Sequence, residues 1–137
     1  MNSFGREIPL VDLAGLTSAE AGARTRMLAT LRSAYVTCGF MYLRNHGVAQ
    51  PLIDAVFAQS RQFFSLPPEL QNRAKPKELG STRGDEGVGA QALEAGRPGD
   101  LKDIFQCGAE PARTRPNAWP EDLTEFRQTL LEFLDAA

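Results

Sequence analysis

The stretch Gly39–Val48, GFMYLRNHGV, decides how the rest of the chain is interpreted. Its first residue, Gly39, follows apolar residues at helical spacing and stands where a helix commonly ends on a left-handed residue. The segment Phe40–Leu43 has the aromatic and aliphatic composition that is typical of a strand. The segment Arg44–Gly47 has the composition of a turn. The stretch therefore predicts the end of a helix, a short strand and the turn that follows it.

Upstream of this stretch, the sequence predicts a strand and a long helix. Ile8–Leu13 (IPLVDL) is short and aliphatic, with its proline near the start, where a missing N–H does least harm to a strand. Thr17–Glu20 has the spacing of a capping box, in which a threonine and a glutamate close a helix N-terminus. Apolar residues then recur at helical spacing as far as Cys38, which predicts a helix of about twenty residues.

Downstream, three further helices and one more strand are expected. Pro51 is suited to the first turn of a helix that ends near Ser65, and Leu66–Leu70 reads as a short third helix. Asp103–Cys107 is a candidate strand. Glu121–Ala137 carries apolar residues on one helical face, and the chain stops while this pattern is still running. The Gly-rich segment between these elements, residues 75–99, predicts a loop.

These elements predict an α+β architecture of three to four helices with a few short strands. So few strands cannot close a sheet of their own, and the helices would leave apolar faces in need of cover. Such exposed apolar faces normally mark an interaction surface.

Composition excludes several classes of function. The 137 residues carry a formal charge of −2, which gives no electrostatic footprint for nucleic acid or an anionic membrane. The N-terminus lacks an apolar run long enough for a signal peptide or a membrane span. The chain's two cysteines, Cys38 and Cys107, form no Cys-x-x-Cys pair. We therefore expect a cytoplasmic protein with reduced thiols.

No catalytic or metal-binding residue is expected in this chain. Non-haem iron oxygenases hold Fe(II) through two histidines and a carboxylate, whereas this sequence contains one histidine, His46. A structural role in the turn backbone is favoured for His46 over metal ligation. Cys38 is expected to be a small core residue, and Cys107 to be exposed without an activating cation.

Several motifs follow one another in an order that resembles a known family. They are IPLVDL, GFMYLRNHGV, FFSLPPE, GDLKDIF and NAWP. This set resembles the N-terminal region of the isopenicillin N synthase-like non-haem iron/2-oxoglutarate-dependent dioxygenases. The resemblance runs from Ile8 to the last helix. It is carried by Pro9, Asp12, Gly39, Phe40, Asn45, His46, Gly47, Phe64, Pro67, Lys102, Trp119 and Pro120.

The resemblance implies that residues 1–137 form the N-terminal domain of such an oxygenase. In that family, this region packs against a double-stranded β-helix (jelly-roll) core. That core carries the iron triad and the arginine that binds 2-oxoglutarate. Fe(II), 2-oxoglutarate and a small-molecule substrate are thus implied for a complete enzyme. We expect a truncated chain that binds no cofactor and is inactive alone.

The resemblance also places a loop near the mouth of the active site, matching Gly80–Gly99. Arg83, Asp85 and Phe105 are therefore candidate substrate-proximal residues. Relatives often show Arg-Gly-Tyr where this chain has Arg83-Gly84-Asp85. A carboxylate there would favour a cationic or hydroxylated group. A solvent-facing loop position without a role is the interpretation we favour.

Two functions of different class remain open. The chain is either a fragment of an oxygenase or a stand-alone interaction module. Such a module would dock onto a separate oxygenase chain or associate with itself.

Overall fold

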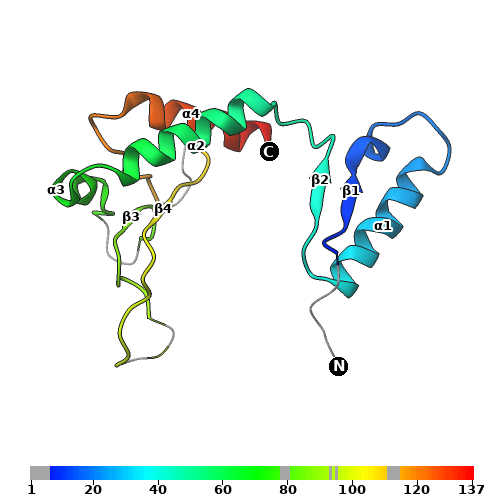
Figure 1. Ribbon diagram of the computed structural model, residues 1–137. Coiled ribbons are helices and arrows are strands. Elements are labelled where there is room, and N and C mark those ends of the chain that lie inside the picture. Colours follow the sequence, from blue (N-terminus) through cyan, green and yellow to red (C-terminus); the bar gives the residue numbers. More distant parts are fainter. Residues whose placement is uncertain (1–6, 78–80, 93, 95, 111–114) are drawn as a thin grey trace. The chain divides into compact units, whose positions relative to one another are not determined.

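The computed structural model describes residues 7–77, 81–92, 94, 96–110 and 115–137. The chain divides into two compact units, Met1–Val48 and Ala49–Ala137, which are described separately below. Figure 1 shows the helices and strands of each unit.

The first unit is a parallel strand pair joined by a helix. Its elements are β1 (Leu10–Asp12), the 3₁₀ helix η1 (Leu13–Leu16), α1 (Ala23–Thr37) and β2 (Tyr42–Arg44). β1 and β2 pair in parallel, with Leu10 opposite Tyr42. A parallel pair needs a crossover connection, and α1 supplies it. Val11 at the centre of β1 is fully buried, together with Met27 and Ala34 of α1.

Gly39 ends α1 as predicted. Its φ is 79°, in the left-handed region, and its N–H donates to the carbonyl oxygens of Ala34 and Tyr35, each at 3.1 Å. Cys38, expected in the core, is half-buried at this end of the helix. The left-handed glycine reverses the chain so that β2 can run beside β1.

The predicted capping box is wrong. α1 begins at Ala23, its N-cap is Gly22, and no side chain caps it. Thr17 instead ends η1. Glu20 accepts from the Arg26 guanidinium at 2.5 Å rather than reaching back to a cap N–H. The helix consequently has 15 residues instead of about twenty.

The second unit packs two long helices beside an antiparallel strand pair. Its elements are α2 (Gln50–Phe64), α3 (Pro68–Gln71), the 3₁₀ helix η2 (Asn72–Ala74), β3 (Gly84–Glu86), β4 (Ile104–Gln106) and α4 (Thr124–Ala136). α2 and α4 lie side by side (Figure 1). The start of α2 at Gln50–Pro51, its end at Ser65 and the short α3 agree with the sequence predictions.

Aromatic rings from four separate segments form the core of the second unit. Phe63 of α2 stacks on Phe126 of α4, with ring centroids 5.1 Å apart. Phe105 of β4 meets both rings edge-on, at 5.1 Å from Phe63 and 4.9 Å from Phe126. Trp119 lies 5.5 Å from Phe105. Phe63 is fully buried and Phe126 is 1% exposed. The cluster thus holds α2, α4 and β4 together.

The Gly-rich segment contains a strand that the sequence did not predict. β3 pairs antiparallel with β4, and Gly84 lies opposite Gln106. Gly84 has a φ of 150°, and a Cβ atom there would collide with the carbonyl oxygen of Ala74. Only glycine allows this close approach of the strand to η2. Residues 78–80, 93 and 95 of the predicted loop lie outside the described residues.

The structure confirms the α+β class, with four α-helices and short strands in the described residues. These strands form two separate pairs and close no barrel. Among the helices described, none combines the length and the apolar character needed to cross a bilayer.

We expect Phe126→Ala to destabilise the second unit by about 3–5 kcal/mol, because it removes a buried ring and leaves a cavity among three others. Urea unfolding followed by tryptophan fluorescence measures this loss. Phe57→Ala is the matched control, since Phe57 is 60% exposed on α2. An equal loss in both variants would contradict the assignment of the core.

Candidate functional site

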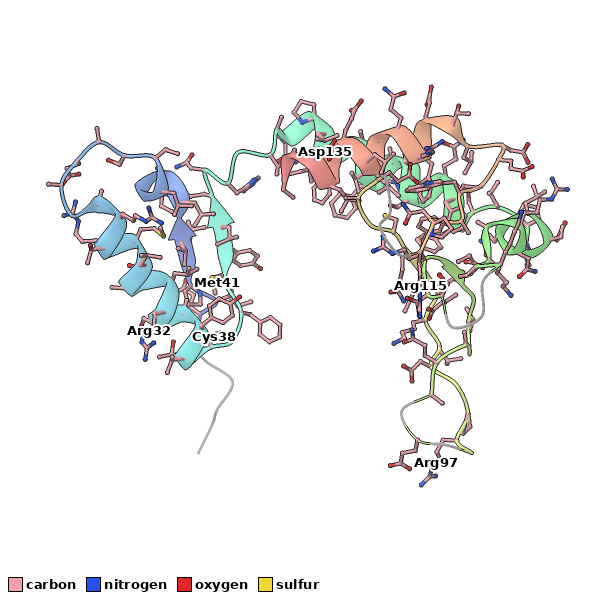
Figure 2. All side chains as sticks on the ribbon, turned by 180° about the vertical axis from the view of Figure 1, so that it is seen from behind. Arg32, Cys38, Met41, Arg97, Arg115 and Asp135 are labelled. Carbon is pink, nitrogen blue, oxygen red and sulfur yellow. The ribbon has the colours of Figure 1, made fainter. Side chains whose placement is uncertain are left out.

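The β3–β4 hairpin places two of the three candidate site residues on one ladder and the third immediately before it. Asp85 lies directly opposite Phe105, and Arg83 immediately precedes β3. The hairpin continues beyond the two strands, where Gly89 N–H donates to Asp100 O at 3.0 Å. Figure 2 shows Arg97 at the end of this hairpin, away from α2 and α4.

Phe105 is a core residue. Its ring contacts Phe63, Phe126 and Trp119, as described above. These contacts hold β4, the strand that pairs with the Asp85 strand, against α2 and α4.

Arg83 is held by the segment that leads into α4. Its Nη1 donates to Asn117 Oδ1 at 3.4 Å, and its carbonyl accepts from the N–H of Ala118 at 3.0 Å. The guanidinium packs so closely on Gly108 that a Cβ atom there would collide with it. Arg83 is therefore a structural residue that connects the start of β3 to Gly108 and to the Asn117–Ala118 segment.

Asp85 is buried, with 2% of its surface exposed. The favoured interpretation of this position as a solvent-facing loop residue is therefore wrong, because the segment forms a strand whose second residue faces inward. The Oδ1 atom of Asp85 accepts no hydrogen bond from the described residues. Burial without a donor is unfavourable for a carboxylate.

The surroundings of Asp85 disfavour the ionised form of its carboxyl group. Desolvation raises the pKa of Asp85 above its ordinary value, and the nearby carboxylates of Asp103 and Glu86 raise it further. The positive charge of Lys75 partly opposes this rise. Asp85 and Lys75 line the same surface hollow of about 720 Å³. The hairpin thus presents an unsatisfied carboxyl group at the wall of a hollow.

Glu110 collects hydrogen bonds from three side chains. Its Oε1 accepts from Trp119 Nε1 at 2.7 Å and from Asn117 Nδ2 at 3.1 Å. Its Oε2 accepts from Arg127 of α4 at 2.6 Å. The Trp119 and Arg127 hydrogen bonds hold the pKa of Glu110 below its ordinary value. Nothing in the sequence pattern pointed to Glu110, because its partners are distant in the chain.

Asn117 also hydrogen-bonds to the backbone of Gly108. Its Oδ1 accepts from the N–H of Gly108 at 3.0 Å, and its Nδ2 donates to Gly108 O at 2.7 Å. Cys107 beside it was expected to be exposed, but it is half-buried. Burial raises the pKa of the Cys107 thiol, which leaves it an unactivated thiol despite the nearby Arg83.

In the first unit, the signature residues hold the two strands together. Asp12 accepts from Arg44 Nε and from Asn45 Nδ2, both at 2.8 Å. The Asn45 and Ala14 hydrogen bonds lower the pKa of Asp12 most strongly. Pro9 O accepts from the N–H of Tyr42 at 2.8 Å. Hydrogen bonds therefore connect residues 8–13 (IPLVDL) to residues 42–45.

His46 stabilises the turn after β2, as predicted. Its Nδ1 accepts from the N–H of Val48 at 3.2 Å. Asn45 and Gly47 on either side have φ values of 55° and 88°. Both lie in the left-handed region, which asparagine and glycine adopt most readily. Phe40, in contrast, is 75% exposed.

The remaining signature residues occupy structural positions in the second unit. Phe64 packs edge-on against Phe63 at 5.2 Å, and Pro67 precedes α3. Lys102 pairs with Asp100 at 3.1 Å. Pro120 is buried, and its carbonyl accepts from the N–H of Leu123 at 3.3 Å.

The residues that the structure describes do not fit an iron centre. They contain no group of three histidine, cysteine, aspartate or glutamate side chains that could hold a metal ion. The single histidine is hydrogen-bonded within a turn. No iron ligand is therefore assigned among the described residues.

Comparison with known families matches residues 8–122 to the family described as non-haem dioxygenase in morphine synthesis, N-terminal. The chain belongs to this family. The match includes β1, β2, the β3–β4 hairpin and the Trp119-Pro120 segment, and it ends just before α4.

The similar proteins include named enzymes. The 2-oxoglutarate-dependent dioxygenase tropC of Talaromyces stipitatus is 35% identical over 147 residues, covering 96% of this chain and 45% of the relative. Codeine O-demethylase of Papaver somniferum is 33% identical over 130 residues, covering 93% of this chain and 35% of the relative. The chain thus spans less than half the length of these relatives.

A solved structure shares the fold. It is the crystal structure of a full-length Neurospora crassa protein in complex with alpha-KG, which is 25% identical and superposes with a TM-score of 0.79. The superposition covers 99% of this chain and 44% of the Neurospora protein. The fold described above therefore corresponds to less than half of the Neurospora chain.

We expect Glu110→Gln to lower stability by about 1 kcal/mol at neutral pH, because hydrogen bonds to a charged, partly exposed group are replaced by weaker ones. The folded state lowers the pKa of Glu110, so its contribution is present above the unfolded pKa and is lost as pH falls through the folded pKa. Urea unfolding between about pH 3 and pH 7 should show the two proteins converging in acid. The exposed Glu121→Gln is the control, and parallel wild-type and Glu110→Gln curves would contradict this role.

Asp85→Asn should change the pH dependence in the opposite direction. The folded state raises the pKa of Asp85, so the wild type loses stability as pH rises through that value, and the variant does not. The stability of the variant relative to wild type should therefore increase from acid to neutral pH, by on the order of 1 kcal/mol. Asp100→Asn, at an exposed position, should leave this dependence unchanged. A constant difference between Asp85→Asn and wild type would show that the Asp85 carboxyl is not destabilised by burial.

Proposed function

We propose that residues 1–137 act as the N-terminal, non-catalytic domain of an Fe(II)/2-oxoglutarate-dependent oxygenase that acts on a small molecule. A catalytic jelly-roll domain, in the same polypeptide in relatives, would supply the iron ligands and the 2-oxoglutarate site. The observation that carries the proposal is the family match over residues 8–122 in a chain that spans 45% of a relative named as a dioxygenase.

The surface of the first unit supports this proposal. Tyr35, Val36, Phe40 and Tyr42 are each more than 60% exposed, at 64%, 75%, 75% and 62%. Exposed aromatic and aliphatic side chains on this scale mark a surface that another protein surface covers. An isolated two-stranded pair is also marginally stable in water, so β1 and β2 would gain stability from further strands. The catalytic domain is the partner we propose for this surface.

The proposal extends to the hairpin and to the location of the protein. Arg83, Asp85 and Phe105 would lie near the substrate in the complete enzyme, with Asp85 as the residue that meets it. Arg83 and Phe105 would position the strand that carries Asp85.

We place the protein in the cytoplasm, because Cys38 and Cys107 are free thiols.

Sequencing the genomic DNA beyond codon 137, followed by a complementation assay, tests the proposal. We expect an open or frameshifted coding segment with a His-x-Asp motif. The segment would be expressed alone and together with this chain, with Fe(II), ascorbate and 2-oxoglutarate, and succinate would be measured. Succinate above a metal-free control should require the downstream segment. Succinate formed by residues 1–137 alone would overturn the proposal.

The alternative, a stand-alone interaction module, predicts a different outcome. No dioxygenase motif would then follow codon 137, and the exposed apolar residues of the first unit would be covered by self-association. Size-exclusion chromatography with light scattering would detect such oligomers, whereas a monomer would exclude self-association.

A further inference from the structure

Two carboxyl groups of the hairpin have oxygen atoms without hydrogen-bond donors. They are Oδ1 of Asp85, in a residue that is 2% exposed, and Oδ1 of Asp103, in a half-buried residue. Neither accepts a hydrogen bond from the residues that the structure describes. A buried carboxylate oxygen in this state is unfavourable unless a donor reaches it.

The strand register places both carboxyl groups on one face of the hairpin. Asp85 lies directly opposite Phe105, so their side chains leave the ladder on the same side. Asp103 precedes Phe105 by two residues, and side chains two residues apart in an extended segment share a face. The Coulomb repulsion by which Asp103 raises the pKa of Asp85 agrees with this placement.

The neighbouring carboxylate, that of Glu86, does receive hydrogen bonds from side chains of the hairpin. Glu86 follows Asp85 directly, and its Oε1 accepts from Gln106 Nε2 at 3.1 Å. Its Oε2 accepts from Gln91 Nε2. Glu86 is therefore fully engaged within the hairpin, while Asp85 beside it is left without a donor on Oδ1.

The hollow lined by Asp85 is an open surface depression of about 720 Å³. A small organic group can enter it from solvent. Lys75, Ser81 and Thr82 line it together with residues 85–91. A Cβ atom added to Gly87 or Gly89 would meet nothing within 4 Å, so these positions leave the hollow open.

We propose that Asp85 binds the ammonium group of a small organic amine in this hollow. Asp103 does not line the hollow, and its contribution is the attraction of its nearby negative charge. An ammonium group carries three N–H donors and a positive charge, so it can donate to the unsatisfied Oδ1 of Asp85 and also be attracted by the nearby carboxylates. A hydroxyl group has a single O–H to donate and brings no charge. A bare metal ion would need more ligands than the carboxyl groups here, and the described residues contain no group of three histidine, cysteine, aspartate or glutamate side chains that could hold one. That the amine is the substrate rests on the proposed function, whereas its binding does not.

Titration of the ¹⁵N-labelled 137-residue chain with n-butylammonium chloride tests the proposal at about pH 7. Sodium chloride keeps the ionic strength constant, and 1-butanol and sodium butyrate serve as neutral and anionic probes of similar shape. We expect saturable amide shifts at hollow-lining positions such as Thr82, Glu86 and Val88, with butylammonium alone. Asp85→Asn should weaken this binding about tenfold, as expected when a charge-assisted hydrogen bond is lost.

Three further variants keep the result interpretable. Asp103→Asn should weaken binding less than Asp85→Asn, and it supplies a second test if Asp85→Asn alters the fold seen in its amide spectrum. Asp100→Asn, at an exposed position of the same hairpin, should bind as the wild type does. Lys75→Met removes the competing positive charge and should leave binding intact or tighten it.

Several outcomes would overturn the proposal. They are equal binding by Asp85→Asn and wild type, equal shifts with 1-butanol, or no saturable shift in the wild-type chain. Binding that appears only in Lys75→Met would show that Lys75 itself satisfies Asp85. Loss of amine binding when the downstream segment is added would assign the site to a lysine or arginine of that segment. None of these results depends on succinate formation, so they are separable from failure of the proposed function.

Discussion

The second unit depends on the contact between four aromatic rings. α2, β4, α4 and the segment between the last two each contribute one ring, namely Phe63, Phe105, Phe126 and Trp119. A two-stranded hairpin is marginally stable by itself. Because Phe105 is anchored among the other rings, β4 is fixed to the helices, and β3 is then fixed by pairing with β4. The position of Asp85 therefore follows from hydrophobic packing on the other strand.

Two acidic residues near this cluster have opposite surroundings. Glu110 receives donors from Trp119, Asn117 and Arg127, so its ionised form supports the fold. Asp85 is buried with one oxygen unsatisfied, so its ionised form opposes the fold. Natural proteins keep such unfavourable groups mainly where function uses them. Glu110 therefore stabilises the fold, whereas the Oδ1 atom of Asp85 still lacks a hydrogen-bond donor.

Local sequence patterns predicted the elements that local forces determine. Gly39, Pro51 and His46 occupy the predicted helix end, helix start and turn, because glycine, proline and a turn side chain impose their conformations within a few residues. The capping box failed because the chain forms η1 and a left-handed Gly22 before the helix starts. β3 and the burial of Asp85 could not be read from the sequence. Both arise from pairing with a strand about twenty residues away and from the close approach of Gly84 to Ala74.

The crowding at Gly84 also bears on which substitutions the strand accepts. Any other residue at that position would strike the backbone of Ala74, so the path of the strand is fixed at that point. The next position has no backbone collision of this kind, and its side chain lines the hollow that Gly87 and Gly89 also line. Because Asp85 is buried, a substitution of similar size, such as asparagine, would change the chemical group at position 85 while the backbone keeps its path. The two neighbouring positions thus divide the work: Gly84 fixes the path of the strand, and position 85 sets the chemistry at the wall of the hollow.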